Sequence, residues 1–244
     1  MAQPSSSERL HERFGSTDLG LALLSLASGS TDVMAFLTLG QIFTSAMTGN
    51  MALLAIAVGQ GRLTSALLSF LALLGFVFGA AIATAIYNAR NAPTRVVLRP
   101  LLLLELVCLA SFAFAWNFFD RSVENFGLDV LILLSATAMG IQGVAARLIK
   151  APGINTIVFA STLVTIVMSV TGAVAKPSSH PPVRINTARQ IGMFLAYGLG
   201  GLLAAFMAWR GPTLLQWLPL LAVLGALGCY EFADCWARRI EPSG

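Results

Sequence analysis

Residues 28–50 decide the class of fold, and they read Ser-Gly-Ser-Thr-Asp-Val-Met-Ala-Phe-Leu-Thr-Leu-Gly-Gln-Ile-Phe-Thr-Ser-Ala-Met-Thr-Gly-Asn. One acid, Asp32, stands inside an apolar run, and a short polar break separates that run from a second one beginning at Met51. An ionised carboxylate near the centre of a bilayer costs ~2.5–3.5 kcal/mol on insertion scales. We therefore expect a membrane helix whose acid faces a wet cavity, finds a partner or takes a proton.

Two interpretations of Asp32 remain open at this point. Burial disfavours the charged form of a carboxyl group, which would suit a proton-coupling site. The alternative is a structural acid that is hydrogen-bonded to Ser28, Ser30 or Thr31 on its own helix. Intramembrane ionisable residues are functional by default, so the coupling interpretation is preferred.

The composition of the whole chain supports a membrane protein. Of 244 residues, 57% are apolar and only 11% are charged, and the mean hydropathy is +0.79. Ordinary soluble domains carry about 25% charged residues, and disordered chains are still more polar. The net charge of +4 comes from Lys and Arg at the ends of apolar segments, which indicates topology rather than nucleic-acid binding.

Eight apolar segments follow one another with short connections, so we expect an all-α, polytopic transmembrane helix bundle. The second segment is short for a full span, which takes ~20 residues. The segments are residues 20–39, 46–60, 63–87, 99–117, 127–148, 154–175, 190–209 and 213–233.

The two halves of the chain resemble each other. Residues 23–39 align with 134–150, and residues 41–60 align with 153–172 after one insertion. The alignment pairs glycines and threonines as well as the abundant aliphatic residues, and such internal duplication is common in transporters. Asp32 aligns with Gly143, so the acid belongs to one half only.

The distribution of positive charge favours six spanning helices over eight. If segments two and six re-enter without crossing, only Arg62, Arg121 and Arg210 of the fifteen Lys and Arg residues lie outside. The positive-inside rule expects such a bias, whereas eight crossings give a poor one. The six-span arrangement inverts the second half relative to the first, and the eight-crossing arrangement remains an alternative.

The expected polar site combines the two breaks with nearby polar residues. Thr48-Gly49-Asn50 precedes an apolar run, and Thr and Asn are preferred N-cap residues. We expect one of them to cap a helix that begins there and directs free N–H groups at a solute. An ordinary interfacial cap is the simpler interpretation. The full set of candidate binding or coupling residues is Asp32, Thr44, Thr48, Gly49, Asn50, Glu105, Gln142, Asn155, Thr156, Ser161 and Thr162.

Small residues in two long segments predict close helix packing. Gly75 and Gly79 form a GxxxG pattern, and Gly198, Gly200 and Gly201 occur in the corresponding later segment. Packing within the bundle is the preferred interpretation, and a homo-oligomer through these glycine faces is the alternative.

Several of these motifs together resemble a known family. Gly29-Ser-Thr-Asp32, Phe36-Leu-Thr-Leu-Gly40 and Met47-Thr-Gly-Asn50 in the first half, with Ala138-Met-Gly-Ile-Gln142 and Pro152-Gly-Ile-Asn-Thr156 in the second, are similar to the YoaK-like family. This resemblance implies a bacterial multi-pass inner-membrane protein with six transmembrane segments. Gly143 and Ala160-Ser161 depart from the family pattern in the second half.

We therefore expect a membrane transporter of a small polar or anionic solute, with proton coupling through Asp32. A passive channel and a membrane scaffold are the alternatives, and the absence of a recognisable nucleophile–base pair argues against an enzyme. No cofactor, metal or nucleic acid is expected, and the bilayer and a solute are the expected partners. The predicted parts are a cytoplasmic N-terminus at 1–19, membrane repeats at 20–117 and 127–233, and a cytoplasmic tail at 234–244.

Overall fold

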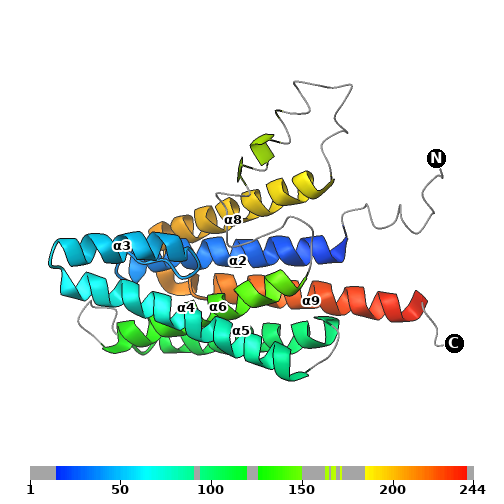
Figure 1. Ribbon diagram of the computed structural model, residues 1–244, viewed down its shortest axis with the longest axis horizontal. Coiled ribbons are helices and arrows are strands. Elements are labelled where there is room, and N and C mark those ends of the chain that lie inside the picture. Colours follow the sequence, from blue (N-terminus) through cyan, green and yellow to red (C-terminus); the bar gives the residue numbers. More distant parts are fainter. Residues whose placement is uncertain are drawn as a thin grey trace.

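The computed structural model describes residues 15–90, 94–119, 126–149, 163–164, 166–168, 171 and 185–240. Within these ranges the regular structure is helical, and the helices lie side by side in one bundle (Figure 1). The elements are α2 (Ser16–Thr38), α3 (Met47–Gly59), α4 (Leu63–Arg90), α5 (Thr94–Ala115), α6 (Phe126–Leu148), α8 (Ile185–Arg210), the 3-10 helix η1 (Pro212–Leu214) and α9 (Trp217–Ile240).

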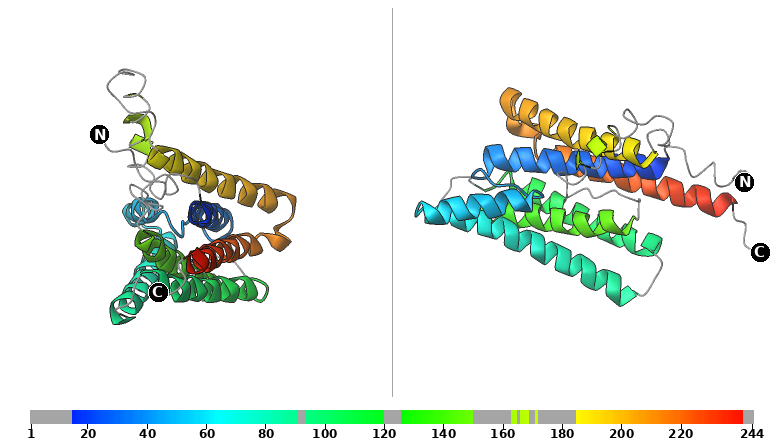
Figure 2. Two further views of the ribbon diagram at one scale, coloured as in Figure 1. Left: turned by 90° about the vertical axis from the view of Figure 1, so that its right-hand side faces the viewer. Right: turned by 45° about the horizontal axis from the view of Figure 1, so that its top comes forward.

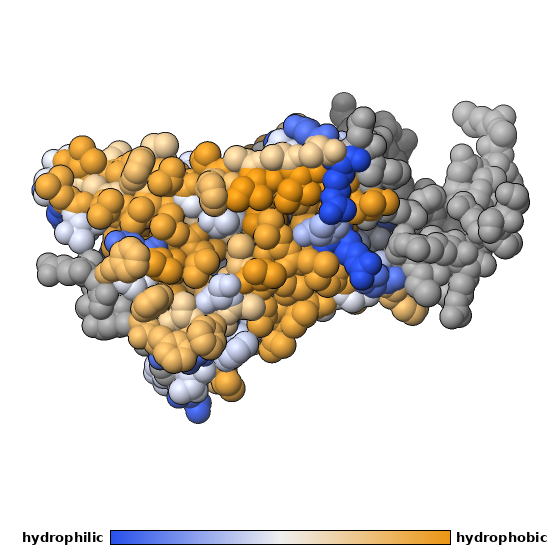
Figure 3. All heavy atoms as spheres, turned by 90° about the horizontal axis from the view of Figure 1, so that it is seen from below, coloured by the Kyte–Doolittle hydropathy of each residue, from blue (hydrophilic) through white to orange (hydrophobic). Residues whose placement is uncertain are grey.

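Among the described residues, five helices are long and apolar enough to cross a membrane: α2, α4, α5, α6 and α8. The outward side chains of these helices include many large apolar residues, and Figure 3 shows one face as a broad apolar surface. Such a surface is suited to contact with lipid rather than water. The prediction of an all-α membrane protein is therefore confirmed. Helix α3 has 13 residues, and the apolar part of α9 is Trp217–Ala233, so both are shorter. The count of six spans stays a prediction.

Two apolar clusters fix the directions of the helices. Leu24 and Leu101, from the first halves of α2 and α5, pack with Ile141 from the second half of α6. Leu39 and Phe112, from the ends of α2 and α5, pack with the beginnings of α4 and α6. Successive long helices therefore run in alternating directions through the bundle. As a result, the beginning of α2 and the end of α9 lie at the same end (Figures 1 and 2).

Glycines bring α2 and α8 into backbone contact. A Cβ atom added at Gly29 would collide with the carbonyl group of Tyr197, and one added at Gly200 would collide with the carbonyl group of Leu26. Membrane helices approach this closely where small residues replace larger side chains. The two helices run in the same direction, because Asp18 and Arg189 pair near their beginnings.

Helices α4 and α6 cross in the same manner. A Cβ atom at Gly79 would collide with the carbonyl group of Thr137, and one at Gly140 would collide with that of Phe76. The prediction that the glycines pack within the bundle is thus confirmed for Gly75, Gly79, Gly200 and Gly201. Gly198 differs, since it is exposed and has open space where a side chain would extend.

The chain breaks sharply between α2 and α3. Gly40 has φ of 80° and Gln41 has φ of 63°, so two consecutive residues adopt the left-handed conformation. Glycine adopts this conformation without steric cost, whereas glutamine rarely does. Residues 39–46 then pass through the interior without helical structure, and Leu39 and Ile42 are buried there. The predicted break after the first segment is therefore present, and it places this connecting segment beside α2.

Candidate functional site

The centre of the site is the carboxylate of Asp32. Asp32 lies in the second half of α2 and is 1% exposed. Helix α2 ends six residues later at Thr38, and the chain then returns through the connecting segment. The buried acid therefore faces the polar groups of a non-helical segment, where backbone N–H groups are free to donate.

Five hydrogen bonds from the described part of the chain reach this carboxylate. Oδ1 accepts from the backbone N–H groups of Thr44 at 2.8 Å and Ser45 at 2.7 Å, and from the Thr44 hydroxyl at 3.2 Å. Oδ2 accepts from the Ser45 hydroxyl at 2.6 Å and from the Tyr197 hydroxyl at 2.7 Å. A buried charge is tolerated when such bonds replace its hydration shell. Asp32 thereby joins α2, the connecting segment and α8.

The two oxygens of Asp32 have different partners. Backbone N–H groups can only donate, so two of the bonds to Oδ1 require an acceptor there. Both partners of Oδ2 are hydroxyl groups, and a hydroxyl can rotate to donate or to accept. A proton can consequently be accommodated on Oδ2 without a change in the heavy-atom contacts.

Asn50 holds the connecting segment from the other side. Its Oδ1 accepts from the backbone N–H of Phe43 at 2.8 Å, and its Nδ2 donates to the carbonyl oxygen of Phe43 at 2.6 Å. The Phe43 ring also stacks on Phe36 of α2, with the ring centroids 5.2 Å apart. Asn50 thus fixes the residue that precedes the donors Thr44 and Ser45.

The expectation that Thr48 or Asn50 caps α3 is wrong. The helix begins at Met47 with Ala46 as its N-cap, and no side chain caps it. Thr48 is exposed, and Gly49 lies against the Phe43 ring, where an added Cβ would come within 2.9 Å. Helix α3 therefore begins close to the predicted position but lacks the predicted cap, because the Asn50 amide hydrogen-bonds to the backbone of Phe43 instead.

Gln142 lies at a separate polar contact between α2 and α6. Its Nε2 donates to the carbonyl oxygen of Leu24 at 2.8 Å and to the Ser28 hydroxyl at 2.9 Å. The Thr31 hydroxyl reaches the Met139 sulfur at 3.2 Å across the same crossing. Ser28 and Thr31 therefore serve the α2–α6 contact, and Asp32 takes its partners elsewhere.

Glu105 lies on α5, away from the groups that surround Asp32, and it is 0% exposed. Of the predicted candidates, the structure thus brings Asp32, Thr44 and, through Phe43, Asn50 together. Four other predicted candidates, Asn155, Thr156, Ser161 and Thr162, lie outside the described residues. Within the described ranges no group of three or more His, Cys, Asp or Glu residues could hold a metal ion.

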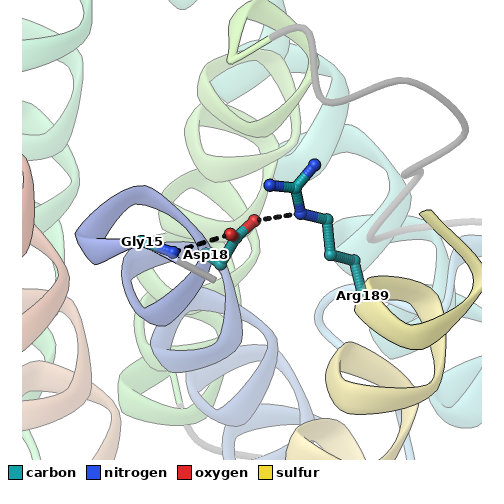
Figure 4. A network of polar contacts seen from close by, with 3 residues as sticks. All are labelled: Gly15, Asp18 and Arg189. Carbon is teal, nitrogen blue, oxygen red and sulfur yellow. Dashed lines mark hydrogen bonds and ion pairs between the residues drawn. The ribbon is translucent and has the colours of Figure 1, made fainter. Parts of the chain in front are cut away.

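An ion pair joins α2 and α8 at the end of the bundle where α2 begins (Figure 4). Arg189 Nε lies 2.8 Å from Asp18 Oδ1, and both side chains are largely buried. Asp18 Oδ2 also accepts from the backbone N–H of Gly15 at 3.0 Å, which satisfies a free donor at the start of α2. Asp18 and Asp32 therefore both connect α2 to α8, through an Arg and a Tyr respectively.

Sequence reasoning missed Ser45, Tyr197 and the Asp18–Arg189 pair. Ser45 lies within residues 28–50, but no sequence pattern distinguishes it from its neighbours. Tyr197 is 165 positions from Asp32, and only the fold brings the two together. The charges at the starts of two apolar segments were a usable signal for the ion pair, once those helices were known to run in parallel.

This architecture and its centre define a polytopic α-helical membrane protein with a buried carboxylate between α2, the connecting segment and α8. The sequence comparisons agree with that class. A family described as "Protein of unknown function (DUF1275)" matches residues 20–229, and the chain belongs to this family.

A curated relative supports the assignment. The UPF0700 transmembrane protein YoaK of Bacillus subtilis (strain 168) is 31% identical over 209 residues, which cover 85% of this chain and 91% of the relative. The predicted resemblance to the YoaK-like family is therefore confirmed. No solved structure matches the chain.

Proposed function

We propose that the chain is a secondary transporter of a small anionic or polar solute, and that Asp32 carries the coupling proton. The observation that carries this proposal is the set of five donors around one buried carboxylate, beside the non-helical segment that separates α2 from α3. Transporters build their binding sites from such interrupted segments near the membrane midplane.

The donors around Asp32 have the chemistry of an anion-binding site. Consecutive backbone N–H groups and hydroxyls form concave sites for anions in many proteins, and here they come from Thr44, Ser45 and Tyr197. The carboxylate of Asp32 occupies that site itself. In this conformation it acts as a tethered anion that competes with any anionic solute.

Protonation of Asp32 would release the donors for another anion. A proton on Oδ2 removes the negative charge, and the Ser45 or Tyr197 hydroxyl can turn to accept from it. The two backbone N–H groups then face a neutral carboxyl group and can bind a solute anion more strongly. A proton and an anion would consequently bind together, which is the thermodynamic basis of symport.

The helix crossings support an inverted internal repeat. One shift along the sequence carries Leu26 and Gly29 of α2 onto Thr137 and Gly140 of α6. A second common shift carries Phe76 and Gly79 of α4 onto Tyr197 and Gly200 of α8. Each close contact between α2 and α8 thus has a counterpart between α6 and α4. Helix α6 runs opposite to its equivalent α2, and α4 runs opposite to its equivalent α8.

With this repeat, six helices span a bacterial inner membrane, and both termini lie in the cytoplasm. In this arrangement α3 re-enters from the outside and Arg62 lies outside, as the charge bias requires. Under the same shifts Asp32 corresponds to Gly143 and Tyr197 to Phe76, so both members of the carboxylate–phenol pair are missing from the second half. This joint replacement supports one coupling site per chain.

Proton movement in proteoliposomes tests the function. Vesicles carrying an internal pH dye would be exposed to pools of small organic and inorganic anions, sugars and amines. We expect anion-dependent acidification with the wild type, its loss in Asp32→Asn, and its retention in Asp129→Asn, a carboxyl control at the start of α6. Anion flux should persist in Asp32→Asn, because the amide leaves a neutral site.

Other outcomes would replace this proposal. Coupled acidification that survives in Asp32→Asn would remove Asp32 from the proton step. Solute flux without proton movement in the wild type would indicate a passive channel. A cellular phenotype that tolerates Asp32→Asn but fails on enlargement of Gly75 or Gly79 would indicate a membrane scaffold.

A further inference from the structure

A second buried acid lies in the bundle, and the proposed mechanism does not use it. Glu105 of α5 is 0% exposed. Neither Oε1 nor Oε2 has a hydrogen-bond partner among the residues that the structure describes. Asp32, in contrast, accepts five hydrogen bonds. The two acids therefore occupy opposite environments in one bundle.

The surroundings of Glu105 are apolar. Helix α5 packs against α6 and α9 and makes a smaller contact with α4. The neighbouring turns of α5 contribute buried leucines to the main apolar cluster, which also includes Ile141 and Val223. Those leucines are Leu101, Leu102, Leu106 and Leu109.

No described cation is in place to neutralise Glu105. On α5 itself, Arg99 is six residues away, about 9 Å along a helix axis, and pairs with Glu231 of α9 at 2.8 Å. Cys108 is the titratable neighbour on the next turn of α5. The other described titratable or charged residues on the packed helices are Asp129 and Arg147 on α6, Cys229, Tyr230 and Glu231 on α9, and Tyr87 and Arg90 on α4.

We propose that Glu105 is a second proton-binding site, held as the neutral acid in the apolar core between α5, α6 and α9. An isolated carboxylate in such surroundings costs far more than a neutral carboxyl group, and the group takes a proton instead. The site binds one proton in the conformation seen here. It does not depend on the role proposed for Asp32.

The affinity of Glu105 for its proton depends on these surroundings. A hydrogen-bond acceptor that reached the carboxyl group would stabilise the neutral acid further. Water that entered the core would instead solvate the carboxylate and lower the affinity of Glu105 for its proton.

Infrared spectroscopy of the full chain in lipid nanodiscs tests the proposal. Protein grown with carboxyl-labelled glutamate would be compared as wild type, Asp32→Asn and Glu105→Gln at pH 7 and pH 8. Exposed glutamates, with pKa near 4.3, are ionised there. We expect one protonated carboxyl band, at the position of a group without hydrogen bonds, in the wild type and Asp32→Asn, and its loss in Glu105→Gln.

A second measurement needs no variant. A membrane-permeant carbodiimide reacts with protonated carboxyl groups, so mass spectrometry of the wild type should place an adduct on Glu105 at pH 7, whereas a water-soluble carbodiimide should leave it unmodified. Identical infrared spectra of the wild type and Glu105→Gln would overturn the proposal, and so would absence of both the band and the adduct. Failure of anion transport would leave these results unchanged, so the two proposals can fail separately.

Discussion

Tyr197 contacts α2 twice, once through its backbone and once through its side chain. Its carbonyl group lies against Gly29, and its hydroxyl donates to Asp32 Oδ2 at 2.7 Å. Gly29 and Asp32 are three residues apart and therefore lie on one face of α2. One residue of α8 thus determines both how closely the two helices approach and how the carboxylate is held.

Removal of the Tyr197 hydroxyl should destabilise the protein measurably. In Tyr197→Phe the ring and the backbone contact remain, but Asp32 loses one donor. Hydrogen bonds to charged groups contribute about 1.5–3 kcal/mol, so the free energy of unfolding in detergent should fall by that amount. Tyr87→Phe, at an exposed tyrosine of α4, should unfold like the wild type. Equal stability of the two variants would contradict the role given to Tyr197.

Alanine at the crossing glycines should separate the helices. Gly29→Ala and Gly200→Ala each place a methyl group against a backbone carbonyl, which cannot move as a flexible side chain can. Overpacking of this kind typically costs about 1–3 kcal/mol. Gly198→Ala on the same helix meets open space and should be neutral or slightly stabilising. Thermal unfolding of the three variants would reveal the contrast, and a uniform response would speak against it.

Asn50 should control the order of the connecting segment. Asn50→Ala removes both hydrogen bonds to the Phe43 backbone, which should cost about 1–3 kcal/mol and loosen the donors that follow. Amide hydrogen exchange at residues 43–45 should accelerate, while exchange in the middle of α4 should not. Asn88→Ala, at an exposed position of α4, is the matched control. Unchanged exchange at residues 43–45 in Asn50→Ala would rule out this anchoring role.

The two buried acids should respond oppositely to leucine. Glu105→Leu replaces a neutral, unpaired group with an apolar one of similar size, and such exchanges are neutral or stabilising. Asp32→Leu leaves several buried donors without an acceptor, and breaking such a network costs about 3–5 kcal/mol. Chemical denaturation of both variants measures the difference. Strong destabilisation by Glu105→Leu would mean that its carboxyl group has a partner in the native state.

Cysteine labelling should place the ends of the bundle on opposite sides of the membrane. In a background with Cys108, Cys229 and Cys235 replaced by serine, Arg62→Cys should react with an impermeant thiol reagent added outside intact cells. Glu231→Cys, at the other end, should react only after permeabilisation. The reverse pattern would invert the orientation, and reaction of both in intact cells would contradict the alternating helix directions.

The class of protein and its central acid could be predicted from sequence because both depend on local composition. Apolar runs of sufficient length specify membrane helices regardless of their partners. Asp32 is conspicuous for the same reason, since an acid inside such a run has few explanations. The break after Leu39 was also visible, because Gly40 permits the left-handed conformation that ends α2.

The partners of Asp32 could not be predicted, because they depend on packing. The local alternative, in which Ser30 or Thr31 binds Asp32, is not what forms: those hydroxyls bond to the Ala27 carbonyl oxygen of their own helix. The expected cap at Thr48 failed for a related reason. A polar residue near a helix start can cap it or bind another part of the chain, and only the tertiary fold decides between them.

The spacing of the contacts to Asp32 has a consequence for biogenesis. Four of its five hydrogen bonds come from Thr44 and Ser45, only 12 and 13 residues further along the chain. The fifth comes from Tyr197, which is synthesised 165 residues later. The acid can therefore be satisfied as soon as its own hairpin leaves the ribosome, and the translocon can release α2 into lipid long before α8 exists. A nascent chain that ends after α6 should already hold Asp32 stably in the membrane. Docking of α8 then adds the hydrogen bond from Tyr197.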